Sequence, residues 1–214
     1  MSRPCAVLFD CDGTLVDTEQ VCNSGLTTLL NSLGIAISVQ ECRSVFTGLT
    51  TQDTVHWAAA RLGPRTPPDL ARQIEEMEIR AVASEVVPLP GVSECLAQLT
   101  CPCAVVSNGS LAKMRASLTS SGLIQRFEGR LFSSEQVARG KPDPAVYLLA
   151  AHALECEPCD CWVVEDSIAG IESGMSAGMR VFGLTGHLTA TEITAARATP
   201  VGSFYELVPF LPHA

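Results

Sequence analysis

Short, uninterrupted runs of hydrophobic residues alternate along this chain with longer segments that have the periodicity of helices. The hydrophobic runs cover residues 5–9, 104–106, 130–132, 162–164 and 181–184. Runs that are this short and apolar at successive positions are typical of parallel strands covered on both faces. The helix-like segments cover residues 92–99, 111–120, 145–154 and 168–177. The alternation predicts an α/β fold with a Rossmann-like parallel sheet core flanked by helices.

Residues 18–84 interrupt this alternation, because they show helical periodicity and no convincing strand. The helix-like segments here cover residues 21–33, 39–46, 54–62 and 69–86. A stretch of this length suffices for a small helical bundle, but such a bundle is marginal alone and should pack on the core. We therefore expect an all-α domain at residues 17–84, inserted after the first strand, and an α/β core made of residues 1–16 and 85–214.

Charge and length exclude several classes of partner. The 214 residues carry a formal net charge of −9, which repels both nucleic acid and anionic membrane surfaces. No apolar run approaches the ~20 residues that span a bilayer, and the N-terminal run is too short for a signal peptide. We expect a cytoplasmic protein, a monomer or weak homo-oligomer, whose partner is a small molecule.

The chain contains ten cysteines. Without a secretory signal, the expected state is a free thiol packed as a small hydrophobic group. A cluster of potential metal ligands leaves a metal or redox role open as the alternative; it comprises His152, Cys156, Cys159 and Cys161. Structural zinc sites usually show two well-spaced pairs, and the second pair is missing here, so free thiols remain the favoured interpretation.

Polar residues stand directly after three of the predicted strands and before one of the predicted helices. They are Asp10, Ser107, Asn108, Glu165 and Asp166, with Lys141 ahead of the helix at 145–154. In an open parallel sheet, ligands bind beyond the carboxyl ends of the strands. These side chains, from four separate elements, should therefore meet in one crevice.

The first cluster reads Asp10-Cys11-Asp12-Gly13. Carboxylates two residues apart on extended chain point the same way, roughly 6–7 Å from each other. Such a pair can divide the chemistry, one carboxylate attacking while the other moves protons. The alternative is an ordinary turn that Asp12-Gly13 closes at the end of a strand.

The other clusters complement this pair. Ser107-Asn108-Gly109 offers a hydroxyl, an amide and backbone N–H groups before a helix, which suits an anion, although an N-cap would use the same residues. Lys141 lies in Gly140-Lys-Pro-Asp-Pro144, where the prolines hold it in place. Glu165 and Asp166 end a buried strand and need a cation or a donor, and a hard cation fits.

These clusters together resemble the motifs of the haloacid dehalogenase superfamily, and within it the beta-phosphoglucomutase-like phosphatases with a helical cap. The four matching segments, in order, are Asp10-x-Asp12-Gly13-Thr14 continuing to Asp17, Ser107-Asn108-Gly109, Gly140-Lys141-Pro-Asp-Pro, and Val164-Glu165-Asp166-Ser167. The resemblance covers the whole chain, and the helical insert stands where this family has its cap. It implies a magnesium-dependent phosphatase that acts through a phospho-aspartate.

The resemblance also implies roles. Asp10 would be the nucleophile, and Asp12 the general acid and base. Mg²⁺ would be held by Asp10, the Asp12 carbonyl and Asp166, with Glu165 acting through water or orienting Asp166. The phosphoryl oxygens would be held by Ser107, by the N–H groups around Asn108 and Gly109, and by Lys141, which would also offset charge repulsion.

Differences between this sequence and two related branches of the superfamily reduce the number of reactions to expect. A dehalogenase has no need for Asp12. The sugar phosphomutases of this group carry a His where this chain has Cys22, and an Arg in the region of Leu49, Thr50 and Thr51. We therefore favour a phosphatase of a sugar phosphate or a phosphosugar acid such as 6-phosphogluconate. A sugar phosphomutase, and a non-catalytic binding protein with this fold, remain the alternatives.

The expected substrate-binding loop contains hydroxyl groups but no cation, which suits a polyol better than a second phosphate. Its residues are Thr47, Gly48, Leu49, Thr50 and Thr51. A phosphosugar acid would call for a cationic partner such as Arg43, Lys113 or Arg115, although a solvated helix face is the favoured interpretation for each of them.

Overall fold

The computed structural model describes residues 3–46 and 49–211. Its centre is one sheet of parallel strands in the order β3-β2-β1-β4-β5-β6. The strands are β1 (Ala6–Phe9), β2 (Cys103–Ser107), β3 (Leu131–Ser133), β4 (Cys161–Glu165), β5 (Arg180–Leu184) and β6 (Thr199–Val201). The five strands expected from the hydrophobic runs are present, which confirms the predicted α/β class.

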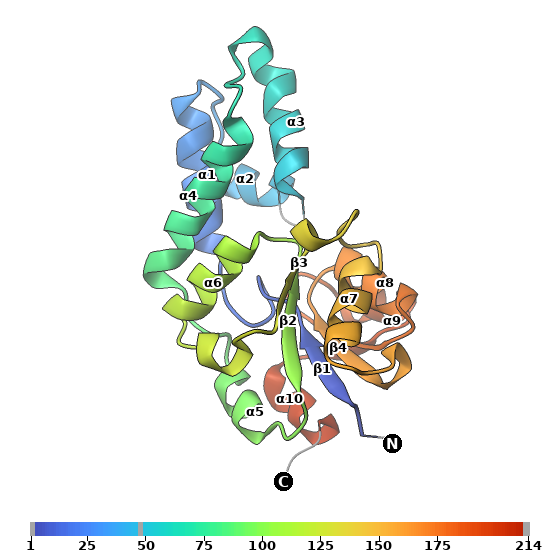
Figure 1. Ribbon diagram of the computed structural model, residues 1–214. Helices are drawn as coiled ribbons and strands as arrows, with labels where there is room; N and C mark the ends of the chain where they lie inside the picture. The colour runs from blue at the N-terminus through green and yellow to red at the C-terminus, as the bar shows by residue number, and fades with distance from the viewer. Residues whose placement is uncertain (1–2, 47–48, 212–214) are drawn as a thin grey trace.

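Helices cover both faces of this sheet (Figure 1). They are α5 (Val92–Gln98), α6 (Leu111–Ser120), α7 (Ala145–Ala153), α8 (Ile168–Ser176), α9 (Ala190–Ala195) and α10 (Phe204–Leu207). Successive residues of β1 belong to different hydrophobic clusters: Val7 and Phe9 pack on one face, and Ala6 and Leu8 on the other. Both faces of the central strand are therefore buried, as its uninterrupted hydrophobic run predicts.

The sixth strand was not predicted. β6 is three residues long, Thr199-Pro200-Val201, and pairs with β5 at the edge of the sheet. It has no apolar run to mark it, and a proline normally argues against a strand. Because β6 is an edge strand, its outer side has no neighbouring strand, and the missing N–H of Pro200 costs no hydrogen bond of the sheet.

Four further helices stand beyond the carboxyl ends of the strands, at the top of Figure 1. They are α1 (Glu19–Ser32), α2 (Val39–Phe46), α3 (Thr51–Leu62) and α4 (Leu70–Glu85), and we call them the helical segment. They enclose a hydrophobic cluster of their own, which includes Leu30, Phe46 and Ile74. The chain enters and leaves the segment side by side, because Val16 forms a bridge with Pro88. Helix α4 packs against α1 and also against α6 of the sheet layer.

Short 3-10 helices fill several connections, namely η1 (Gly63–Arg65), η2 (Ile124–Phe127), η3 (Ser134–Gln136), η4 (Pro158–Asp160) and η5 (Val208–Phe210). Among the described residues, no helix has both the length and the apolar character that crossing a bilayer requires.

One prediction about the cysteines is wrong. Cys5 and Cys156 form a disulfide across 151 residues of sequence, whereas free thiols were expected. The pair meets because β1 and β4 are neighbours: Ala6 lies opposite Cys161, and the N–H of Cys5 donates to the carbonyl of Asp160. Strand order, which the spacing of the cysteines does not reveal, therefore produces the contact. The other eight cysteines are free.

Candidate active site

The carboxyl ends of three neighbouring strands meet at one point. Phe9 at the end of β1 pairs with Val105 of β2 and with Val164 of β4. The residues that follow these strands therefore come together at the middle of the sheet edge. They face a cavity of about 510 Å³ that residues of the helical segment line from the other side. Every site residue expected on the strand ends except Glu165 lines this cavity, namely Asp10, Asp12, Ser107, Asn108, Gly109, Lys141 and Asp166.

Lys141 is buried and ties the strand ends together. Its Nζ donates to Asp10 Oδ1 at 2.6 Å, to Glu165 Oε1 at 2.6 Å and to the carbonyl oxygen of Val106 at 2.8 Å. An ammonium has three hydrogens, so all of its donors are used. Burial alone would lower the pKa of Lys141, but the two carboxylates outweigh it and raise the pKa well above its ordinary value. Lys141 therefore stays charged beside Asp10.

Asn108 braces the main chain of Lys141. Its Nδ2 donates to the Lys141 carbonyl at 3.0 Å, and its Oδ1 accepts from the Lys141 N–H at 2.8 Å. A Cβ on Gly140 would come within 2.5 Å of Asn108 Oδ1, so this close approach requires a glycine. The amide of Asn108, expected in the anion cradle, is thus occupied in holding Lys141, and the cradle retains the backbone and Ser107.

Glu165 is fully buried and surrounded by donors. Besides Lys141, it accepts from Tyr147 Oη at 2.9 Å, from Ser167 Oγ at 3.0 Å and from the N–H of Asp166 at 3.1 Å. Helix α8 lies so close that a Cβ on Gly170 would sit 1.8 Å from this carboxylate. A carboxylate held by so many donors favours the orienting role among the two expected for it.

Asp10, Glu165 and Asp166 form the potential metal-binding group. One carboxylate oxygen of each lies within 4.8 Å of the others, and within the described residues no other group of three such side chains, cysteines included, comes as close. Burial, reinforced by Glu165, raises the pKa of Asp10 from 3.8 to about 7 despite the attraction of Lys141. Burial, followed by the charges of Asp10 and Glu165, also raises the pKa of Asp166. Three carboxylates face one ammonium here, and a divalent cation with oxygen ligands would balance the excess.

Asp166 is held against the turn after β1. Thr14 Oγ1 donates to Asp166 Oδ1 at 3.3 Å. Gly13 has a φ of +81°, and a Cβ there would lie 2.2 Å from Asp166 Oδ2. Glycine is therefore needed for the backbone conformation and for the approach of the carboxylate. The Asp12-Gly13 pair therefore does more than close an ordinary turn, because Gly13 allows Asp166 to approach the backbone.

Asp12 points to the junction between the sheet and the helical segment. Its Oδ1 accepts from Thr18 Oγ1 at 2.6 Å, and its Oδ2 lies 3.3 Å from Lys113 Nζ. Lys113 in turn lies 3.7 Å from Glu78 Oε1 on α4. Asp12 is thus attached to groups other than those that hold Asp10. The two carboxylates are placed to do different work.

Ser107 and Gly109 lie ahead of α6, where the anion cradle is expected. The N–H of Gly109 donates to Ser107 Oγ at 3.0 Å, and both residues line the cavity. The N-cap of α6 is Ser110, whose side chain accepts from the N–H of Lys113. Ser107 and Asn108 are therefore not the cap, which removes the structural alternative for them.

The helical segment contributes a mainly uncharged wall. Leu49, Thr50 and Thr51 line the cavity as expected, whereas Thr47 and Gly48 lie outside the described residues. Further residues that line it from this side are Thr18, Glu19, Cys22, Asn23, Leu26, Phe46, Thr54, Ile74 and Glu78. Burial raises the pKa of Cys22 to about 12, so this thiol cannot act as a base near neutral pH.

Several residues of the site were not predicted, and each has a physical reason. Tyr147 follows the apolar pattern of α7, and its only signal is that a buried Tyr hydroxyl needs a partner. Gly170 is an isolated helical glycine, a pattern that often marks close packing. The sequence offers Lys113 as a possible cationic partner of a substrate, but its place in the cavity depends on the packing of α4 on α6.

Comparison with known proteins agrees with this geometry. The family model described as haloacid dehalogenase-like hydrolase matches residues 7–184. A 6-phosphogluconate phosphatase of Escherichia coli is 36% identical over 183 residues, which are 85% of this chain and 83% of that protein. Hexitol phosphatase A of the same organism is 33% identical over 180 residues, 81% and 80% of the two chains. The crystal structure of a haloacid dehalogenase-like protein from Agrobacterium tumefaciens has a TM-score of 0.79, with 31% identity and 96% of each chain covered.

Proposed function

The chain belongs to the haloacid dehalogenase-like hydrolases, and we propose that it is a sugar-phosphate phosphatase that works through a phospho-aspartate on Asp10 with Mg²⁺ as its cofactor. The substrate we propose is a small phosphorylated polyol, sugar or sugar acid such as 6-phosphogluconate. The observation that carries this proposal is the buried ion pair of Asp10 with Lys141, both of which line the cavity at the strand ends.

In the first step, a carboxylate oxygen of Asp10 attacks phosphorus. The new bond joins Asp10 to the phosphoryl group while the bond from phosphorus to the ester oxygen breaks. Lys141 holds Oδ1 of Asp10, so we assign the attack to Oδ2. Asp12 gives its proton to the departing ester oxygen, and the alcohol leaves.

In the second step, Asp12 takes a proton from a water molecule, whose oxygen attacks the phosphoryl group. The bond between Asp10 and phosphorus breaks, which restores the carboxylate and releases inorganic phosphate. Thr18 and Lys113 hold Asp12 in place for both steps. Ser107 and the backbone around Gly109 would receive the phosphoryl oxygens.

The residues present fit a magnesium site. Asp10 and Asp166 would bind the ion with the carbonyl of Asp12, while Glu165 keeps Asp166 and Lys141 in position. Bound there, the ion would supply positive charge that offsets the repulsion between the Asp10 carboxylate and the phosphate.

We propose that the helical segment, residues 17–84, is a cap that covers the leaving group on a core of residues 1–16 and 85–214. Two observations support this: the segment has its own hydrophobic cluster, and its residues form one wall of the cavity. Leu49 and Thr50, which precede α3, and Thr51 at its start would meet the substrate together with Asn23 and Thr54.

A phosphomutase is the disfavoured alternative. In this chain Cys22 stands where such enzymes carry a histidine, and its raised pKa leaves no base at that position. Water is then the acceptor for the phosphoryl group on Asp10.

A panel of phosphorylated metabolites, assayed with Mg²⁺ for released phosphate, tests the proposal. We expect release from polyol, sugar or sugar-acid phosphates, abolished by EDTA. An Asp10→Asn preparation made in parallel serves as the blank for contaminating phosphatases. Conversion of a sugar phosphate to an isomer without phosphate release would instead indicate a mutase, and absence of any turnover would favour the binding-protein alternative.

A further inference from the structure

The cavity contains two lysines in different situations. Lys141 uses its three donors on short bonds at the floor. Lys113 also has a buried side chain, 12% exposed, but its ion pairs are longer, at 3.3 Å to Asp12 and 3.7 Å to Glu78. An ammonium with two long contacts retains capacity for a further acceptor. Lys113 is therefore the lysine available to a substrate.

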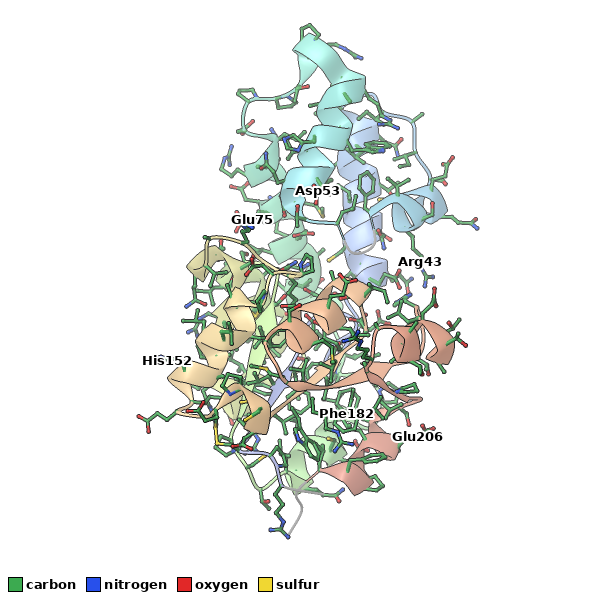
Figure 2. All side chains as sticks on the ribbon, turned by 90° about the vertical axis from the view of Figure 1, so that its right-hand side faces the viewer. Arg43, Asp53, Glu75, His152, Phe182 and Glu206 are labelled. Atoms are coloured by element: carbon green, nitrogen blue, oxygen red, sulfur yellow. A yellow bond between two sulfur atoms is a disulfide. The ribbon has the colours of Figure 1, made fainter. Side chains whose placement is uncertain are left out.

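The other cations considered for a sugar acid are placed differently. Arg43 pairs with Glu19 at 2.7 Å, its side chain is 58% exposed, and it does not line the cavity; Figure 2 shows it near the junction with the core. Arg115 pairs with Glu128 on the exposed side of α6. Of these three cations, Lys113 is the one that lines the cavity, where a carboxylate could reach it.

Glu78 opposes the attraction between Lys113 and a carboxylate of the substrate. It lies on α4 of the helical segment, lines the cavity and faces Lys113 on α6 of the core. Asp12 and Glu78 thus place two carboxyl groups beside one ammonium. Asp12 is required for proton transfer in the proposed mechanism, and Glu78 is then the member whose charge is free to tune selectivity.

The proposal rests on the phosphatase function given above. We propose that the Lys113–Glu78 pair determines whether the cavity accepts a leaving group that carries a carboxylate. A carboxylate on the leaving alcohol is attracted by Lys113 and repelled by Glu78, whereas a hydroxymethyl group at the same carbon responds to neither charge. The uncharged side chains of Asn23, Thr50 and Thr54 line the same cavity and would contact the hydroxyls that both substrates share.

A matched pair of substrates isolates this effect. D-Gluconate 6-phosphate and D-glucitol 6-phosphate have the same stereochemistry and the same phosphorylated carbon, and differ only at C1. For each enzyme form, kcat/KM for the acid is divided by kcat/KM for the polyol. A change in the chemical step affects both substrates and cancels in this ratio. A change in the ratio therefore measures how the enzyme responds to the carboxylate at C1.

Relative to wild type, we expect Glu78→Gln to raise this ratio about tenfold and Lys113→Met to lower it about tenfold. Each helix offers a control. Glu76 lies on the same helix as Glu78 but pairs with Arg72, so Glu76→Gln is the control for Glu78→Gln. Arg115 lies on the same helix as Lys113 but pairs with Glu128, so Arg115→Met is the control for Lys113→Met. Both controls should leave the ratio unchanged.

Glu78→Gln decides the matter even if Lys113→Met fails to fold, because a glutamine can keep the contact with Lys113 without the charge. An unchanged ratio in Glu78→Gln, with both substrates hydrolysed, overturns the assignment of charge selectivity while the phosphatase function stands. Hydrolysis of neither substrate by wild type overturns the proposed function and this inference with it.

Discussion

The sheet edge and the helical segment face the same cavity but are built in different ways. On the sheet side, buried charged groups from separate strands hold one another at short distances, as Lys141 does with Asp10 and Glu165. On the helical side, the neutral side chains of Asn23, Thr50, Thr51 and Thr54 stand among apolar residues, and Glu19 and Glu78 are the charged residues of the segment that line the cavity. In the proposed mechanism, the first wall is preorganised for the reaction and the second offers adaptable contacts to a variable leaving group.

This difference should govern how each wall responds to substitution. A buried charge that loses its partner is costly, because burial penalises the uncompensated charge. A neutral hydroxyl contributes one hydrogen bond of about 1 kcal/mol and can be replaced by an apolar isostere. Substitutions at the sheet edge should therefore stop the reaction, and those in the helical segment should change which substrate is preferred.

The largest effect is expected for Asp10→Asn. An amide cannot form the phospho-aspartate, so kcat should fall by about 10³-fold or more. The fold should persist, because Asn can still accept the hydrogen bond from Lys141. Since burial raises the pKa of Asp10 to about 7, its ionised form is unfavourable without metal, and the variant should lose no thermal stability at pH 8 in EDTA.

Released phosphate and the melting temperature are the two measurements for this variant. Near-normal turnover would remove Asp10 from the role of nucleophile. Loss of turnover together with loss of the fold would show instead that Asp10 is needed to assemble the sheet edge.

Two helical glycines compare the rigidity of the two walls directly. In Gly170→Ala the new Cβ would lie 1.8 Å from the Glu165 carboxylate, which Lys141 and Tyr147 hold in place. We expect a loss of about 2–3 kcal/mol in the free energy of unfolding, with reduced activity because Lys141 is displaced.

Gly25→Ala in α1 is the matched change in the helical segment. Its Cβ would lie 2.3 Å from Met77 Sδ, but a methionine side chain can move aside. The gain in helix propensity, about 1 kcal/mol, offsets that movement, so stability should change by less than about 1 kcal/mol. Urea denaturation measures both variants, and equal losses would contradict a difference in rigidity between the walls.

Metal binding should couple to pH through Asp10. Its pKa is raised from 3.8 in the unfolded chain to about 7 in the fold. The protonated form therefore stabilises the metal-free protein fully below about pH 4, and this contribution is lost as the pH rises through 7. Mg²⁺ competes with the proton for the carboxylates, so it should stabilise the protein more at pH 8 than at pH 5.5.

At about 100 times its Kd, Mg²⁺ should raise the melting temperature at pH 8 by about 5–10 °C. Differential scanning fluorimetry at the two pH values measures the increment. Asp166→Asn should lose most of it, because a proposed ligand is removed. An increment that is equal at both pH values would place the ion away from Asp10.

The grouping of polar residues at the sheet edge could be predicted because it requires only that the strands be parallel, whatever their order. Asp10, Ser107 and Asp166 each follow a buried hydrophobic run, and parallel strands bring their carboxyl ends to one edge. Lys141 was placed with them from its proline-flanked loop. The sheet itself followed from the same runs, except for β6, whose proline and short length hide it at the edge.

The contacts that depend on how helices pack could not be predicted in this way. Glu78 faces Lys113 only because α4 lies on α6, and either side chain alone has the pattern of a solvated helix face. The Cys5–Cys156 disulfide likewise depends on β1 lying beside β4. Hydrophobic periodicity shows which face of a helix is buried, but it does not identify the neighbour.

The smallest effect on catalysis is expected for a substitution of Thr54, and it tests whether the helical wall contributes to binding alone. Thr54 is buried on α3, lines the cavity, and donates from Oγ1 to the carbonyl of Thr50 at 3.2 Å. Thr54→Val keeps the shape and removes the hydroxyl, so KM for a polyol phosphate should rise about fivefold while kcat is unchanged. Thr194→Val on α9 loses the same kind of bond, to Ala190, outside the cavity, and should leave KM unchanged. A fall in kcat for Thr54→Val would mean that the helical wall also positions the reacting groups, and the division between the two walls would have to be abandoned.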